Sequence, residues 1–227
     1  MRNANPERNH DDNQESIIND FLMKYYFKKA FTAAKLITNK EMQSAGVDVI
    51  CNSKRARDMK IDIKAQSSAK YINDPRPTFS LEVSTYDRYG VEDLVGWFFS
   101  AKAITEYYTF VWIHDAKVDD NKRIRRVDDI QRLEVLTVDA HALQDYIDDI
   151  LYDHELDDID AITQSMRWEE RLRIDVCDGI YYRHSPSLPE KPVNLVVQKR
   201  ILQKFAIESK YGHCMVTKEG MRPIYHN

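Results

Sequence analysis

Two neighbouring stretches of the chain alternate apolar and polar residues, which is the pattern of half-buried β-strands. They cover residues 46–51 (GVDVIC) and 59–66 (MKIDIKAQ). The segment between them, residues 52–58, is polar and basic and is short enough to close a hairpin or meander turn. We therefore expect the two stretches to pair side by side in one sheet.

The second stretch separates its charged side chains from its apolar ones. Asp62 and Lys64 are two residues apart and project from one face of the strand, whereas Ile61 and Ile63 point to the other. If the first strand pairs beside it, Asp48 can lie near Asp62. Two carboxylates and a lysine on neighbouring strands are the groups needed to bind a hard divalent cation and orient a water molecule.

Helical and strand periodicities alternate along the rest of the chain. The polar start, residues 1–15, is expected to be a disordered tail. Strand, helix and strand in succession over residues 79–113 predict a right-handed crossover and at least one parallel pair. The pattern predicts helices over residues 16–38, 91–106, 140–151 and 192–209, strands over 79–83, 108–113 and 133–138, and a hairpin over 171–182 that turns at Asp178-Gly179.

These elements predict an α/β fold with a central mixed β-sheet flanked by helices. Residues 16–150 form the expected core, and residues 151–227 form a C-terminal α+β elaboration packed on it, with an acidic loop, a hairpin and a helix. Hydrophobic residues make up 43% of the 227 residues, which is enough to build a core. One core with an elaboration is favoured over two independent domains.

Composition also bears on the compartment. The three cysteines, Cys51, Cys177 and Cys214, are scattered and odd in number, which fits neither a disulfide framework nor zinc-ligand spacing. The longest apolar run, about residues 94–103, is interrupted by Lys102 and is too short to span a bilayer. The polar start does not have the pattern of a signal peptide. We therefore expect a cytoplasmic protein with no membrane partner.

The net charge of −4 conceals an asymmetry along the chain. Residues 16–70 hold eleven Lys and Arg against five Asp and Glu, a local charge of +6. Residues 139–178 hold three against thirteen, a local charge of −10. The basic segment suits a polyanionic substrate, whereas the acidic one would repel it. Ordinary solvated faces would give the same counts.

The candidate residues and their order resemble the PD-(D/E)xK nuclease superfamily, which has the restriction-endonuclease-like fold. The matching residues are Gly46-Val-Asp48 for the first acid and Ile61-Asp62-Ile63-Lys64 for the (D/E)xK element. The predicted order of elements, αβββαβ, is that of the family core, and the resemblance covers about residues 16–114. Val47 stands where the family name has proline, a position that varies among its members.

The resemblance implies a metal-dependent hydrolysis of nucleic-acid phosphodiester bonds, with DNA as the expected substrate. Asp48, Asp62 and the backbone carbonyl of Ile63 would bind Mg²⁺, for which Mn²⁺ would substitute. Lys64 would orient or activate the attacking water and offset charge in the transition state.

Further residues are assigned by the same resemblance. Glu82, on the strand predicted third, would hold a metal-bound water or a second ion. Gln66 would position water or phosphate. Members of the family often carry an acid on the first helix, for which Asp20 is the first candidate and Glu15 the second. The expected contacts to the phosphate backbone come from Lys54, Arg55, Arg57 and Lys60.

Each assignment has a structural alternative. Asp48 and Lys64 could form an ordinary ion pair at a strand edge, and Gln66 and Glu82 could serve packing alone. The alternative function is a catalytically inactive nucleic-acid-binding or assembly module that retains the nuclease fold, and the acidic second half also fits self-association into a homo-oligomer. Divalent metal binding separates the two functions, since only the nuclease requires it.

Overall fold

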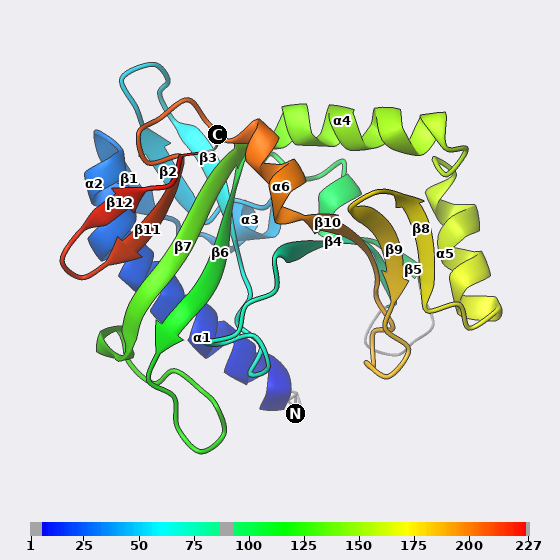
Figure 1. The fold of residues 1–227 in the computed structure, drawn as a ribbon, viewed down its shortest axis with the longest axis horizontal. Helices are drawn as coiled ribbons and strands as arrows, with labels where there is room; N and C mark the ends of the chain where they lie inside the picture. The colour runs from blue at the N-terminus through cyan, green and yellow to red at the C-terminus, as the bar shows by residue number, and fades with distance from the viewer. Residues whose placement is uncertain (1–5, 87–92, 226–227) are drawn as a thin grey trace. The chain divides into compact units, whose positions relative to one another are not determined.

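The computed structural model describes residues 6–86 and 93–225 (Figure 1). It has a mixed α/β fold with two β-sheets flanked by helices. The chain divides into two compact units that interleave in sequence. The first unit comprises residues 1–76, 104–139 and 206–227, and the second comprises residues 77–103 and 140–205.

A seven-stranded sheet forms the first unit. Its neighbours are antiparallel except for one parallel pair, β3 with β6. In spatial order the strands are β1 (Ala33–Leu36), β2 (Val49–Asn52), β3 (Met59–Ala65), β6 (Tyr107–Ala116), β7 (Ile130–Asp139), β11 (His213–Thr217) and β12 (Met221–Pro223).

One face of this sheet packs against the N-terminal helix, α1 (Pro6–Leu22). Ile18 and Phe21 recur at helical spacing and are fully buried in a cluster that includes Ile61, Ile63 and Val111. Burial of each large apolar side chain contributes about 1.5–3 kcal/mol. The packing fixes which face of β3 points inward, so Asp62 and Lys64 emerge from the opposite face, as predicted.

Short helical segments complete the first unit. The helix α1 continues into a π-helical turn, η1 (Met23–Phe27), and one turn of α2 (Lys28–Ala30). Two others are α3 (Lys40–Ser44) and the 3₁₀ turn η3 (Val127–Asp129).

A five-stranded antiparallel sheet forms the second unit. In spatial order its strands are β5 (Asp93–Val95), β4 (Thr78–Tyr86), β10 (Val193–Gln198), β9 (Ile180–His184) and β8 (Arg173–Cys177). Its helical segments are η2 (Trp97–Phe99), α4 (Ala140–Asp153), α5 (Ile159–Trp168), α6 (Lys199–Leu202) and η4 (Gln203–Phe205).

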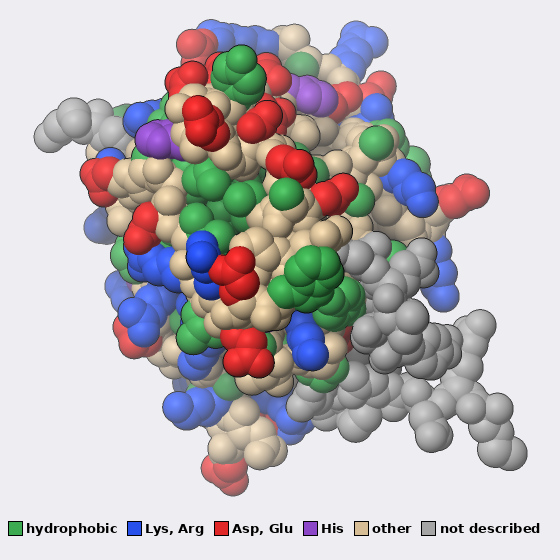
Figure 2. All heavy atoms as spheres, turned by 90° about the vertical axis from the view of Figure 1, so that its right-hand side faces the viewer, with side chains coloured by type: hydrophobic (Ala, Val, Ile, Leu, Met, Phe, Trp, Pro, Cys, Tyr) green, Lys and Arg blue, Asp and Glu red, His purple; other side chains and the backbone are tan. Residues whose placement is uncertain are grey.

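The second unit carries the acidic segment of the chain. Residues 154–158, which join α4 to α5, are exposed except for the half-buried Leu156. Acidic side chains and apolar patches share the face seen in Figure 2. Trp168 at the end of α5 is 81% exposed.

Several predicted elements are confirmed. The strands around Asp48, Asp62 and residues 108–113 and 133–138 are present, as are helix α4 and the β8–β9 hairpin that turns at Asp178-Gly179. Among the described residues, no helix is long and apolar enough to cross a membrane.

The predicted helix over residues 16–38 is wrong at both ends. The helix α1 begins at Pro6, inside the predicted tail, and residues 1–5 lie outside the described part of the chain. At the other end the backbone becomes extended at Phe31, and β1 pairs antiparallel with β2. Pairing with the sheet supplies the backbone hydrogen bonds that a longer helix would have made, so tertiary context overrides the helical spacing.

The predicted helix over residues 91–106 is also wrong in its described part. Residues 93–106 contain β5 and the single 3₁₀ turn η2, and residues 91–92 lie outside the described residues. The backbone at Gly96 lies directly against the carbonyl of Glu82, and its N–H donates to Val83 at 2.8 Å. This close pairing with β4 replaces the helix.

The crossover connection that leads to the parallel strand β6 therefore starts from a different strand than predicted. The parallel partner of β6 is β3, whereas the strand predicted over residues 79–83 is β4 of the other sheet. The expected core of residues 16–150 consequently contains parts of both compact units.

The predicted last helix, residues 192–209, is largely a strand. Val193, Leu195, Val196 and Val197 are buried in β10, between β4 and β9, because apolar β-branched side chains fit a central strand. Helical structure is limited to α6 and η4. Strands β11 and β12 were not predicted.

Candidate active site

Asp48, Asp62 and Lys64 come together in the first unit, as the sequence predicted. The backbone N–H of Asp48, one residue before β2, donates to the carbonyl of Ile61 at 2.9 Å. Its carboxylate Oδ2 accepts the N–H of Ile63 at 2.8 Å. On β3 the ammonium of Lys64 lies 2.9 Å from Asp62 Oδ2. The three charged side chains thus form one cluster across two strands.

A turn at Gly46 positions Asp48, two residues later, in this cluster. Gly46 has φ +79°, a left-handed conformation that favours glycine. A Cβ at this position would lie 2.5 Å from Thr105 Oγ1 and 3.5 Å from Asp62 Oδ2. The Thr105 hydroxyl donates to the Gly46 carbonyl at 2.6 Å, which fixes the turn. The absence of a side chain at Gly46 lets the backbone approach the buried acid.

Burial sets the protonation of the cluster. Asp62 is 4% exposed, and burial raises its pKa to about 7; the nearby carboxylate of Asp48 adds to this rise while Lys64 opposes it. For Lys64, burial works against the charged form, but the carboxylates of Asp62, Asp48 and Glu15 outweigh it, and the net pKa is raised. Lys64 therefore stays protonated. Both Asp62 and Asp48, in their charged forms, are attracted by this one ammonium group.

The two acids predicted on the first helix differ in their electrostatic effect on Lys64. Glu15 lies within electrostatic range of Lys64 and helps to raise its pKa. Asp20 is exposed and is five residues further along α1, which places it about 140° around the helix axis from Glu15. The sequence named Asp20 first and Glu15 second, because it does not fix which face of α1 meets the sheet.

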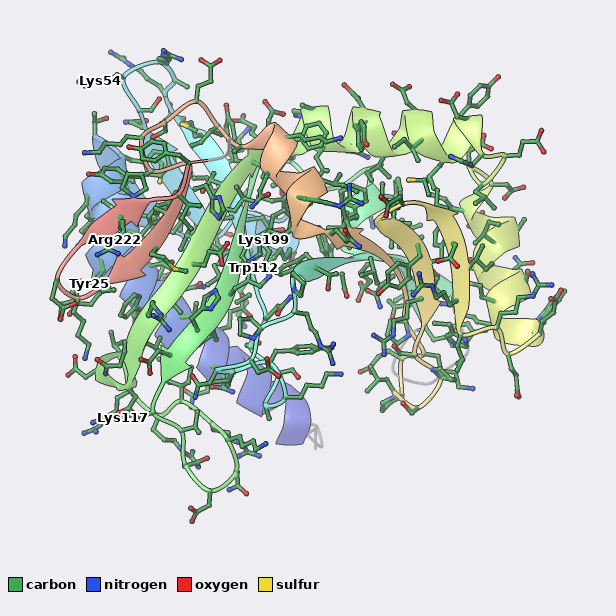
Figure 3. All side chains as sticks on the ribbon, in the orientation of Figure 1. Tyr25, Lys54, Trp112, Lys117, Lys199 and Arg222 are labelled. Carbon is green, nitrogen blue, oxygen red and sulfur yellow. The ribbon has the colours of Figure 1, made fainter. Side chains whose placement is uncertain are left out.

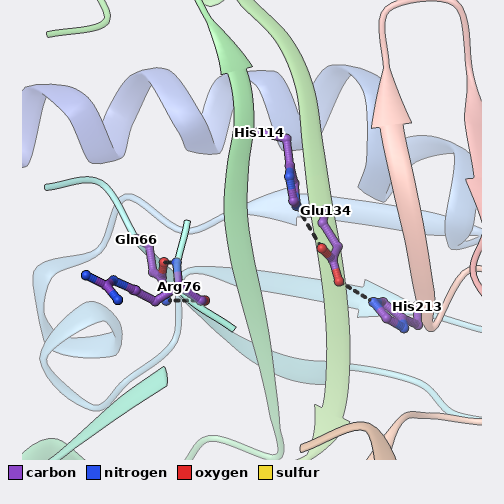
Figure 4. Close-up of polar contacts among 5 residues, drawn as sticks. All are labelled: Gln66, Arg76, His114, Glu134 and His213. Atoms are coloured by element: carbon purple, nitrogen blue, oxygen red, sulfur yellow. Dashed lines mark hydrogen bonds and ion pairs between the residues drawn. The ribbon is translucent and has the colours of Figure 1, made fainter. Parts of the chain in front are cut away.

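Gln66 uses its side-chain amide to hold a loop (Figure 4). Its Nε2 donates to the carbonyl of Arg76 at 3.2 Å, and its Oε1 accepts the N–H of Arg76 at 3.0 Å. Both ends of the amide are therefore engaged with the peptide of one residue. This contact closes the loop over residues 67–75.

Glu82 does not lie on the sheet that carries the cluster. It belongs to β4 of the five-stranded sheet, where it is paired with Asn194 of β10. The strand predicted over residues 79–83 is present as β4, but in the other sheet, and β6 lies beside β3. The cluster as described is built from the first unit alone.

Three of the four predicted phosphate contacts are grouped in the connector between β2 and β3, and the fourth, Lys60, lies on β3. Lys54, Arg55 and Arg57 line a surface hollow of about 590 Å³, and Lys54 projects from the loop tip (Figure 3). Arg55 pairs with Glu208 at 2.7 Å, but both side chains are exposed and the pair contributes little stability. Lys60 lies 3.5 Å from Glu106.

The hollow lies well away from the acidic cluster. Asp58 at the edge of the hollow is six residues before Lys64, which spans roughly 20 Å along an extended strand. The two features would therefore contact different parts of a long ligand.

The cluster offers the donor types that a hard cation prefers. Asp48, Asp62 and the Ile63 carbonyl are oxygen donors of the kind bound by Mg²⁺, which also keeps several waters. Among the described residues, no group of three or more His, Cys, Asp and Glu side chains is arranged to hold a metal ion. The residues present thus fit a cation whose remaining ligands come from water or substrate oxygens.

A second buried polar cluster was not predicted. Glu134 on β7 accepts from the Nε2 atoms of His114 and His213, both at 2.8 Å (Figure 4). Glu134 and His213 are each 5% exposed. The three residues come from β6, β7 and β11, and nothing in their sequence spacing indicates that they meet. The two imidazoles meet the hydrogen-bonding requirement of this buried carboxylate within the sheet.

Comparison of the chain with protein-family models, with curated proteins and with solved structures found no match.

Proposed function

We propose that this protein is a metal-dependent nuclease that hydrolyses nucleic-acid phosphodiester bonds, with DNA as its substrate. The observation that carries the proposal is the cluster of Asp48, Asp62 and Lys64 on neighbouring strands, with Asp48 tied to the backbone between the other two. A buried pair of acids beside a lysine is stabilised by a cation, and it is a common arrangement at catalytic sites.

The topology around the cluster supports a restriction-endonuclease-like core. An N-terminal helix, the antiparallel strands β1, β2 and β3, and the parallel strand β6 occur in that order along the chain, with α3 between β1 and β2 and with β4 and β5 of the other sheet between β3 and β6. Ala33–Leu36 takes the place of the first strand. In this arrangement Asp48 precedes the second strand and Asp62-Ile63-Lys64 lies on the third.

The residues of the cluster have separate roles in the proposed reaction. A bound Mg²⁺ would polarise the scissile phosphate and lower the pKa of a water ligand. Asp48 and Asp62 would hold the ion, and the Ile63 N–H, which donates to Asp48 Oδ2, holds that carboxylate in place. Lys64 keeps its proton on Nζ, so it donates hydrogen bonds to the attacking water or to the phosphate oxygens and offsets their charge.

The basic hollow supports a polymeric substrate. The hollow that Lys54, Arg55 and Arg57 line is separated from Lys64 by roughly 20 Å of extended strand, counted from Asp58 at its edge, which is further than one nucleotide reaches. Positive side chains at that distance would hold the phosphate backbone several nucleotides from the scissile bond without reading bases. A single strand or a duplex satisfies this spacing equally.

A non-catalytic nucleic-acid-binding module is the second candidate. One observation favours it: Lys64 lies 2.9 Å from Asp62, so these two opposite charges are paired within the protein itself. A module of this kind would bind nucleic acid through the basic hollow and would not respond to Mg²⁺.

The test is cleavage of plasmid, linear duplex, single-stranded DNA and RNA by purified protein with Mg²⁺ or Mn²⁺, beside Lys64→Ala and Asp62→Asn. We expect the wild type to cut at least one DNA substrate, both variants to lose the activity, and Asp62→Asn to lose metal binding by calorimetry. Binding of nucleic acid with no cleavage and no metal binding would instead establish the non-catalytic module. Equal cleavage by Lys64→Ala and wild type would refute the assigned mechanism.

A further inference from the structure

The contact between Gln66 and Arg76 fixes a basic residue beside the candidate active site. Gln66 follows β3 directly, and its backbone N–H donates to the Val111 carbonyl at 3.0 Å, so it continues the parallel ladder with β6. Its side-chain amide makes two hydrogen bonds to the peptide of Arg76 (Figure 4). Arg76, ten residues away in sequence, is thereby held at the end of β3.

The position of Gln66 determines on which side of the sheet Arg76 is held. Residues two apart on an extended strand project from the same face, so Gln66 shares the face of Asp62 and Lys64. The Cα atoms of Lys64 and Gln66 are roughly 7 Å apart in such a strand. The Arg76 peptide therefore lies over the same face, within reach of a phosphate group held at Lys64.

A phosphate diester brings its own negative charge to the face that carries Asp48 and Asp62. A nucleic-acid phosphate that approaches this face meets a lysine already paired with Asp62. Arg76 is exposed, and its guanidinium forms no ion pair within residues 6–86 and 93–225.

The local sequence also restricts how Arg76 can move. Pro75 and Pro77 flank it, and a following proline confines the residue before it to extended conformations. The two prolines and the hydrogen bonds from the Gln66 amide together restrain the backbone of Arg76. A guanidinium is suited to phosphate because its planar donors bind two oxygens at once.

We propose that Arg76 binds a phosphate of the substrate strand next to the scissile bond and that Gln66 is its positioning residue. The proposal rests on the nuclease function above and adds to it the group that neutralises the substrate at the site. In this proposal Gln66 acts by positioning Arg76, and not by positioning a water molecule.

The test measures binding and cleavage separately in the full-length protein. Affinity for a fluorescent DNA duplex is measured in EDTA at several salt concentrations, and kcat and KM are measured with Mg²⁺. We expect Arg76→Ala to weaken binding and raise KM about tenfold, with a smaller change in kcat, and to reduce the salt slope by about one. Arg76→Lys should recover part of the affinity, because it keeps the charge but not the fork.

Arg222→Ala is the matched control. This exposed arginine lies on β12, four strands from β3 and therefore roughly 19 Å away across the sheet (Figure 3). We expect it to change KM by less than about twofold.

A double-mutant cycle tests the role of Gln66. If Gln66 acts through Arg76, Gln66→Ala should raise KM severalfold, and Gln66→Ala with Arg76→Ala should behave like Arg76→Ala alone. Additive effects would overturn the positioning role.

The outcomes separate this inference from the proposed function. A wild type that cuts DNA while Arg76→Ala and Arg222→Ala match it in binding and KM overturns the inference and leaves the nuclease function intact. A wild type that neither binds nor cuts DNA overturns both. Melting curves of every variant, together with the Arg76→Lys result, distinguish lost folding from lost contact.

Discussion

The carboxylate of Asp48 accepts the backbone N–H of Ile63 at 2.8 Å. This single bond joins the turn before β2 to the centre of β3, between the two charged residues of the Asp-x-Lys element. It makes the position of Asp48 depend on the backbone of the strand that carries Asp62 and Lys64. The geometry of the cluster is thus set by the main chain as well as by its side chains.

The first prediction separates the charge of Asp48 from its hydrogen bond. Asp48→Asn keeps an oxygen that can accept the Ile63 N–H, so we expect a small loss of stability but cleavage lowered at least about a hundredfold because the metal loses a carboxylate. Asp48→Ala also leaves a buried N–H unpaired and should cost about 1–3 kcal/mol in the free energy of unfolding. Urea unfolding and plasmid cleavage measure the two effects. Equal stability of the two variants would show that the bond does not contribute.

The second prediction concerns the turn at Gly46. Gly46→Ala forces a Cβ towards Thr105 Oγ1 at a left-handed backbone position, and we expect about 1–3 kcal/mol of destabilisation in urea unfolding, with reduced cleavage. Gly220→Ala is the control, since no atom lies within 4 Å of a Cβ placed there. Similar stability of the two alanine variants would contradict the role of the turn.

The third prediction distinguishes the two acids on α1. Glu15→Gln removes a negative charge that acts on Lys64, so we expect cleavage to change severalfold, by about three to ten times. Asp20→Asn should leave the rate within about twofold, because Asp20 is not among the charges that shift the pKa of Lys64. Initial rates measured side by side decide between them, and a larger effect at Asp20 would reverse the assignment.

The fourth prediction is a pH dependence in the second unit. Burial lowers the pKa of His184 on β9, and Arg167 lowers it further. The unfolded chain, with a histidine pKa of about 6.5, then takes up a proton that the folded chain resists. Stability should therefore be unaffected by this group above about pH 7 and should fall as the pH decreases below about 6.5.

Thermal melting of the wild type and of His184→Gln over this range measures that contribution. The variant should lose part of the decline at acid pH. His141→Gln is the control, since His141 is exposed on α4. An unchanged decline in His184→Gln would assign the pH dependence to other groups.

The sequence predicted the core of the site because its signal is local. Alternation along residues 59–66 assigns Asp62 and Lys64 to one face, and the short basic connector brings Asp48 beside them. These relationships need only the strand period and one turn. The parallel strand beginning at Tyr107 was found for the same reason, since a long apolar run indicates a buried strand.

Relationships that depend on distant pairing could not be predicted. Glu82 has a strand pattern like that of Asp62, but periodicity does not reveal which sheet a strand joins. Glu15 and Asp20 lie on one helix, and only the packing of α1 distinguishes them. Gln66 and Arg76 are joined by a side-chain amide, and Glu134 meets two histidines from other strands. None of these contacts has a fixed spacing in the sequence.

The most direct test of the nuclease proposal is the initial rate of plasmid cleavage with Mg²⁺ for the wild type and for Lys64→Ala, each repeated in EDTA. We predict cleavage by the wild type that EDTA abolishes, and a rate at least about a hundredfold lower for Lys64→Ala at a temperature where its melting curve shows it folded. Cleavage that persists in EDTA, or that Lys64→Ala performs at the wild-type rate, would contradict the proposal.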